Sequence, residues 1–155
     1  MIFKRLLASF GFLLISGASQ AHFGMLIPEV DNLSPSLSSA KVTVAFAHPM
    51  QATGMTMQKP QKLYAVANGK KHDLMPSLKA SSLFGKSAFQ AHYCAKRPEL
   101  IQIVLEPTPY WEAAEEKFIV HFTKTYLPMR GEEAGWESPV GLPAEIVPLT
   151  RPFGN

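Results

Sequence analysis

The sequence predicts an all-β protein: a single domain folded as an antiparallel, immunoglobulin-like β-sandwich. Apolar side chains alternate along residues 41–48, which is the period of a strand with one buried face. Asn68-Gly69 separates two strand-like segments, 62–67 and 70–75, as in a hairpin closed by a type I′ turn. No segment has a convincing helical period, and short strands joined by turn residues favour a sandwich over a barrel.

The other expected strands follow in order along the chain. Residues 23–30 are expected to form an edge strand, because Pro28 cannot donate a hydrogen bond to a neighbouring strand. Four further strands are expected at 89–95, 100–106, 117–126 and 144–149. Residues 76–86 are interpreted as a Ser-rich connection. Residues 107–116 are interpreted as a Pro-led acidic segment with about one helical turn.

The first 21 residues have the pattern of a secretory signal peptide. Lys4-Arg5 is a short positive region, residues 6–15 are apolar, and Ser19 and Ala21 are small residues before the expected cleavage position. We expect cleavage after Ala21 and export to the periplasm. The alternative is an uncleaved membrane helix, for which this apolar run is short.

Cleavage would leave residues 22–155 as one β-sandwich domain of nearly neutral charge. The chain has 15 Lys and Arg against 12 Asp and Glu, and two of the basic residues lie in the leader. The sequence has no cluster of basic and aromatic residues of the kind that would predict nucleic-acid binding. Cys94 is the only cysteine, so no internal disulfide can form, and we expect it to be buried in a strand. Hydrolase and phosphate-binding motifs are absent, so the sequence gives little support to hydrolytic chemistry.

The junction at Ala21 and His22 predicts a metal ligand. If His22 is the first residue of the mature chain, its α-amine and its imidazole can close one chelate ring on a metal ion. His48, at the end of the apolar face of residues 41–48, is the expected second ligand. An amine with two imidazoles suits copper(II) or nickel(II). The alternative is that His22 simply follows the cleavage site.

Further candidate ligands are Met55, Met57 and His121. Loop methionines are soft ligands, but they also serve as adaptable packing residues. A histidine in the middle of a strand is also often structural. Glu112 and Glu116 would form a carboxylate pair on a helical turn, although a solvated acidic corner is the commoner outcome. His72, beside the hairpin turn, is expected to be exposed, and His92 has no assigned role.

Several motifs together carry a family resemblance. They are His22-Phe23-Gly24-Met25-Leu26-Ile27-Pro28; Phe46-Ala47-His48-Pro49; Gly54-Met55 with Met57; Glu106-Pro107-Thr108-Pro109-Tyr110-Trp111-Glu112 with Lys117-Phe118-Ile119-Val120-His121; and Glu145-Ile146-Val147-Pro148-Leu149-Thr150-Arg151-Pro152. Over nearly the whole mature chain, these motifs resemble a family of periplasmic nickel/cobalt-uptake accessory proteins. That family carries a domain of unknown function, and its genes often stand beside those of energy-coupling-factor type transporters.

The resemblance implies an extracytoplasmic protein that binds nickel or cobalt and assists a membrane metal transporter, not an enzyme. His22 and His48 match its metal positions, and Met55, Met57 and His121 match positions of the family pattern. Gln51 departs from it, because relatives often have an acid there.

A second departure concerns the C-terminal segment. Relatives continue past the Arg-Pro-aromatic-Gly segment into another β-module, so we expect a truncated chain or a partner that supplies further strands. An exposed apolar edge is expected near residues 149–153. Two other functional classes remain: a copper-binding histidine-brace protein, either carrier or oxidative enzyme, and a metal-free periplasmic structural module.

Overall fold

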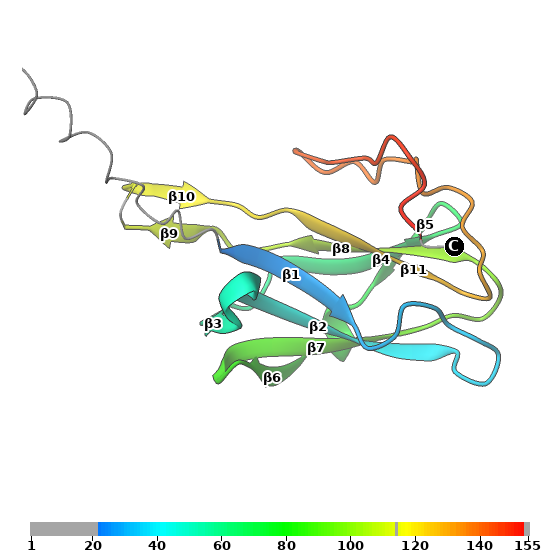
Figure 1. Cartoon of the computed structure of the whole chain (residues 1–155), viewed down its shortest axis with the longest axis horizontal. Coiled ribbons are helices and arrows are strands. Elements are labelled where there is room, and N and C mark those ends of the chain that lie inside the picture. The colour runs from blue at the N-terminus through cyan, green and yellow to red at the C-terminus, as the bar shows by residue number, and fades with distance from the viewer. Residues whose placement is uncertain (1–21, 114, 154–155) are drawn as a thin grey trace, which may run out of the picture.

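The computed structural model describes residues 22–113 and 115–153, which form antiparallel β-sheets packed against each other (Figure 1). The prediction of an all-β sandwich is confirmed. The only helical elements of these residues are two short 3-10 turns, Pro49–Gln51 and Met75–Ser77. None of the described helices is long and apolar enough to cross a membrane. The predicted signal peptide, residues 1–21, lies outside the described residues.

The first sheet has β1 at one edge and β6 at the other, in the order β1-β2-β7-β6. Its strands are β1 (Phe23–Pro28), β2 (Ser39–His48), β7 (Lys86–Cys94), β6 (Lys79–Leu83) and β3 (Thr53–Met55), which pairs with the end of β2. Every neighbouring pair is antiparallel. The edge position of β1 agrees with the prediction made from Pro28.

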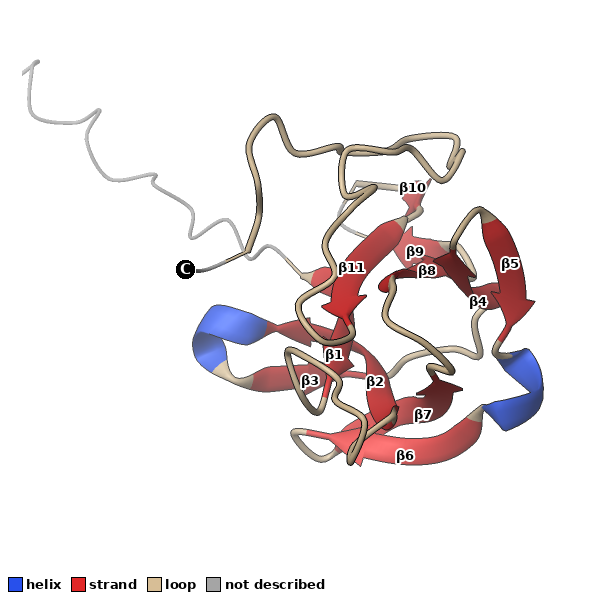
Figure 2. Cartoon of the chain, turned by 90° about the vertical axis from the view of Figure 1, so that its right-hand side faces the viewer, coloured by secondary structure: helices blue, strands red, loops and turns tan. Residues whose placement is uncertain are grey.

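The second sheet has the order β11-β8-β4-β5. Its strands are β11 (Thr123–Pro128), β8 (Leu100–Glu106), β4 (Lys62–Ala67) and β5 (Lys70–Asp73). Figure 2 shows the two layers from the end of the molecule. A separate hairpin of β9 (Tyr110–Glu112) and β10 (Lys117–Ile119) extends beyond the sandwich on the side where β1 begins (Figure 1).

The core lies between the two sheets, and β8 is its most buried strand. Ile101, Ile103 and Leu105 of β8 are fully buried in the main cluster. Val104 points the other way and packs with Val140 of the C-terminal segment in a second cluster. Because this segment covers the outer face of the sheet, β8 is buried on both faces and lacks the alternation of a half-exposed strand.

Two hairpins turn through the same backbone conformation. Asn68 and Gly69 have φ values of 50° and 71°, as the predicted type I′ turn requires. Phe84 and Gly85 repeat this geometry, with φ values of 48° and 71°, between β6 and β7. The interpretation of residues 76–86 as a connection is therefore wrong. Phenylalanine is an unusual residue at positive φ, so the second turn gave no recognisable sequence signal.

Three other expectations about local structure are also wrong. Residues 107–116 contain strand β9 instead of a helical turn, so Glu112 and Glu116 do not share one face of a helix. The expected strand 117–126 is divided into β10 and β11, with residues 120–122 between them. Residues 144–149 form no strand and have irregular backbone with bends.

Cys94 is exposed, which corrects the expectation that it is buried. It ends β7, where side chains alternate between the two faces of the sheet. Tyr93 points into the core and is 6% exposed, so Cys94 must point outward.

The C-terminal segment presents two isolated apolar side chains. Ile146 is 88% exposed and Leu149 is 99% exposed, while Phe153 packs edge-on against Tyr126 with ring centroids 5.9 Å apart. The expected apolar surface near residues 149–153 is thus present at Leu149 but not at Phe153, and it lies on a loop instead of a strand edge.

Glu145 holds this segment against the second sheet. Its carboxylate accepts a hydrogen bond of 2.6 Å from Lys124 Nζ, and both side chains are only 8% exposed. It also accepts hydrogen bonds from the backbone N–H groups of Val140, Gly141 and Leu142. Burial alone would raise the pKa of Glu145, but these donors outweigh burial and lower the pKa to about 2.

The first prediction compares two isoleucines in different surroundings. Ile103→Ala should lower the free energy of unfolding by about 2–5 kcal/mol, because it leaves a cavity in the core. Ile146→Ala makes the same chemical change at an exposed position and should change it by less than about 0.5 kcal/mol. Urea denaturation of the two variants measures this difference, and equal values would contradict the assignment of β8 to the core.

The second prediction concerns pH. The pKa of Glu145 in the folded state lies below its ordinary value of 4.5, so its stabilising contribution is present above that pH and lost as the pH falls toward 2. The full contribution of Glu145 to the free energy of unfolding is roughly 3 kcal/mol. Glu145→Gln should remove most of this acid dependence in urea denaturation between pH 5 and pH 2.5. The matched variant Glu137→Gln, at an exposed position, should retain it.

Candidate metal centre

His22 and His48 lie together because β1 and β2 are antiparallel neighbours. The ladder pairs Phe23 with Ala47, so the next position along it places His22 beside His48. Their ring centroids are 5.5 Å apart, in an edge-to-face arrangement. The start of β1 and the end of β2 therefore bring two of the predicted ligands to one end of the sandwich.

His121 joins this pair from the segment that leads into β11 of the second sheet. It lies in the break between β10 and β11, and its ring centroid is 5.7 Å from that of His22. Gly24 permits this close approach, because a Cβ atom at Gly24 would lie 3.1 Å from the Cβ atom of His121. The Thr123 hydroxyl donates a hydrogen bond of 3.0 Å to the Gly24 carbonyl oxygen. His121 thus occupies a fixed position between the sheets, not the middle of a strand.

Aromatic rings enclose the histidine cluster, which we define as His22, His48 and His121. The rings of Phe46 and Tyr110 meet the ring of His22 edge-on, with centroids 4.9 Å and 5.2 Å away. The side chain of His22 is consequently only 12% exposed. The cluster sits in apolar surroundings at the end of the core.

Two imidazole nitrogens of the cluster are buried without a hydrogen-bond partner among the described residues. They are Nε2 of His22 and Nε2 of His121. Burial, and secondarily the nearby His22, lowers the pKa of His121 below its usual value of 6.5. His121 is therefore neutral at pH 7, which is the state in which an imidazole can bind a metal ion.

Glu112 adds a carboxylate that the sequence analysis assigned to a solvated corner. Its Oε2 atom lies 3.4 Å from His22 Nε2, and its side chain is 18% exposed. Tyr110 and Glu112 are two apart in β9, so they share the face turned toward His22, while Trp111 points away and packs on Phe118. A strand period in residues 110–112, which the helical interpretation overlooked, is the signal that could have identified Glu112.

The two predicted methionine ligands serve mainly as packing residues. Met57 is 8% exposed and belongs to the main core cluster, and Met55 packs against that cluster. Met57 also lines a cavity together with His121. By contrast, Met50 is 90% exposed.

The donor set of the histidine cluster fits a transition-metal ion, although the donor atoms do not yet point at one common position. With bonds of about 2.0–2.1 Å to nitrogen, two imidazoles on one metal ion have centroids roughly 4.5–6.5 Å apart. Both centroid distances from His22 lie in this range. However, no three His, Cys, Asp or Glu side chains in residues 22–113 and 115–153 form a group ready to hold a metal ion. Binding therefore requires side-chain rotation.

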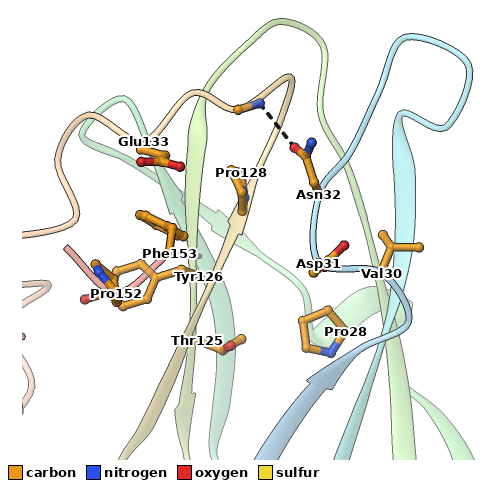
Figure 3. A pocket seen from close by; sticks show the side chains of 11 residues that line it. Pro28, Val30, Asp31, Asn32, Thr125, Tyr126, Pro128, Glu133, Pro152 and Phe153 are labelled. Atoms are coloured by element: carbon orange, nitrogen blue, oxygen red, sulfur yellow. Dashed lines mark hydrogen bonds between the residues drawn. The ribbon is translucent and has the colours of Figure 1, made fainter. Parts of the chain in front are cut away.

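Other features of the molecule contribute nothing to this cluster. A hollow of about 610 Å³ lies at the far end of β1, between Pro28, Tyr126 and Phe153 (Figure 3). Beside it, the Gly131 N–H donates a hydrogen bond of 3.2 Å to Asn32 Oδ1. His72 is exposed on β5, as expected, and its ring meets that of Tyr93 edge-on. His92 is also exposed.

Comparison with known proteins gives a family but no function. One family model matches residues 19–155, and its description is a domain of unknown function, DUF4198. A search of curated proteins found no match. Because the matched residues include all of the described strands, the chain belongs to the DUF4198 family.

Proposed function

We propose that the protein is an extracytoplasmic transition-metal-binding protein that takes up nickel or cobalt at the histidine cluster and assists a membrane transporter. The single observation that carries the proposal is the meeting of three imidazoles from three separate segments, with the buried Nε2 of His121 left without a hydrogen-bond partner among the described residues. Buried polar groups in proteins are nearly always hydrogen-bonded, and exceptions are common at functional sites.

Each member of the cluster has a definite part in this proposal. His121 supplies a buried imidazole nitrogen, and His48 supplies another from the rim at the end of β2. His22 supplies Nδ1, because only this ring nitrogen can close a chelate ring together with the α-amine of the same residue. Glu112 lies 3.4 Å from His22 Nε2, so its carboxylate orients the ring and offsets part of the charge of the cation. Nitrogen donors of this kind suit divalent nickel and cobalt.

The α-amine of His22 is the fourth proposed donor, and it depends on processing. In the full chain the nitrogen of His22 is an amide, which has no available lone pair. Cleavage after Ala21 converts it into an amine, whose pKa of about 7.7–8.0 allows deprotonation near neutral pH. The signal-like leader thus supports both export and the completion of the site.

The choice of nickel or cobalt, and the transporter partner, rest on the family resemblance of the sequence motifs. Copper is the competing ion, because one amine with two imidazoles also suits copper(II), and copper(II) binds most such sites more tightly. Elemental analysis of the processed protein distinguishes the two. A stoichiometric copper content would favour the copper-binding alternative, and no bound metal would favour a structural module.

The third prediction is that metal affinity depends on the exact N-terminus. The mature chain beginning at His22 should bind nickel(II) at least about tenfold more tightly than the same chain with one Ala added before His22, because the added residue turns the amine into an amide. Calorimetric titration of both forms in the same buffer measures the ratio. Equal affinities would remove the amine from the site.

The fourth prediction tests the side-chain ligands. His48→Ala, His121→Ala and Glu112→Gln should each weaken nickel(II) binding by about tenfold or more, because each removes a donor or a compensating charge. His72→Ala makes the same change at an exposed histidine outside the cluster and should leave the affinity unchanged. If His121→Ala binds nickel(II) as tightly as the unchanged protein, the proposed cluster is wrong.

A further inference from the structure

A cavity of about 240 Å³ adjoins the histidine cluster. His121, Phe46 and Tyr110 line it, and these are three of the four rings that contact His22. The rest of its wall comes from Gly24 and from two loop segments, residues 56–58 and 107–109. The cavity and the proposed metal ion would therefore be separated by little more than the ring of His121.

The residues that line the cavity determine which kind of molecule it can bind. Apolar groups dominate it, chiefly Phe46, Met57, Pro109 and Tyr110, and none of the described residues that line it is Lys, Arg, Asp or Glu. A charged group inside it would lack a protein counter-ion and would be costly to bury. An occupant must therefore be apolar over most of its surface and carry any charge at the end near His121.

The volume limits the size of the occupant. A cavity of about 150 Å³ holds a benzene molecule, and drug-sized ligands occupy pockets of about 300–1,000 Å³. At about 240 Å³ the cavity suits a body the size of a leucine or phenylalanine side chain. An opening toward the histidine cluster would leave the polar end of such a molecule beside the metal ion.

We propose that this cavity binds the apolar side chain of a small amino-acid-type chelator, so that the protein takes up the metal ion as a complex with that chelator. The amine and carboxylate of the chelator would bind the metal ion, and the side chain would fill the cavity. The ion then compensates the carboxylate charge, which the cavity wall cannot do. This inference rests on the proposed metal binding at the histidine cluster.

The test uses the mature chain and amino acids as probes. L-leucine and L-phenylalanine are titrated into the nickel-loaded protein, with glycine as the matched control, because glycine has the same chelating groups and no side chain. The larger amino acids should bind about 10- to 100-fold more tightly than glycine, as expected for burial of one apolar side chain. The metal-free protein should bind none of them measurably.

A cavity-filling variant supplies the second comparison. Thr56 lines the cavity from its rim and is exposed, so Thr56→Phe should fill the space without touching a proposed metal ligand. It should retain nickel(II) affinity and lose the preference for leucine over glycine. Gln58→Phe, at another exposed rim position, repeats the test if Thr56→Phe does not fold.

The outcomes separate this inference from the proposed function. If nickel(II) binds but leucine and glycine bind equally, the chelator inference is overturned and metal binding stands. If leucine is preferred but both rim variants retain the preference, the side chain lies elsewhere and the inference is again overturned. If the mature chain binds no nickel(II), cobalt(II) or copper(II), the proposed function and this inference both fail.

Discussion

The candidate site depends on one structural constraint, the register between β1 and β2. Side chains of a strand alternate between its faces, so Gly24 and Leu26 share a face with His22, and Leu26 is buried in the core. On β2, Phe46 and His48 share a face in the same way. Both histidines therefore continue the core-facing surface past the last apolar pair, and a one-residue slip would turn them outward along with the core residues.

The third histidine makes the site a junction between the two sheets. His121 precedes β11, an edge strand of the second sheet, whereas His22 precedes β1, an edge strand of the first. The Thr123 hydroxyl bonded to the Gly24 carbonyl fixes the separation of these two edges. An ion held by His22 and His121 would bind only the folded arrangement of the sheets and so would stabilise the sandwich.

Local sequence signals predicted the elements whose conformation depends mainly on neighbouring residues along the chain. The alternation of residues 41–48 and the Asn68-Gly69 turn depend on neighbours along the chain, and both were identified. The burial of β8 on both faces could not be predicted, because it depends on coverage by residues near Val140. The outward direction of Cys94 is set by the register of β7, which a short apolar segment does not reveal.

The site itself was predictable only in part, for a related reason. His22 and His48 were found because one follows a recognisable cleavage pattern and the other ends a clearly alternating strand. The position of His121 follows from a break between two strands that the sequence presents as one apolar run. Glu112 was missed because its acidic surroundings favour a solvated turn, whereas pairing with β10 makes the segment a strand.

The energetics of the cluster give a final reason to regard it as a binding site. A buried polar atom without a partner costs about 1–3 kcal/mol, and Nε2 of His121 is such an atom among the described residues. Burial lowers the pKa of His121 and so disfavours protonation of its imidazole. A proton is the main competitor of a metal ion for an imidazole nitrogen. The burial that makes the unpartnered nitrogen of His121 unfavourable therefore also keeps its lone pair available to a cation. Glu112, beside His22, supplies a negative charge that offsets part of the charge of such a cation.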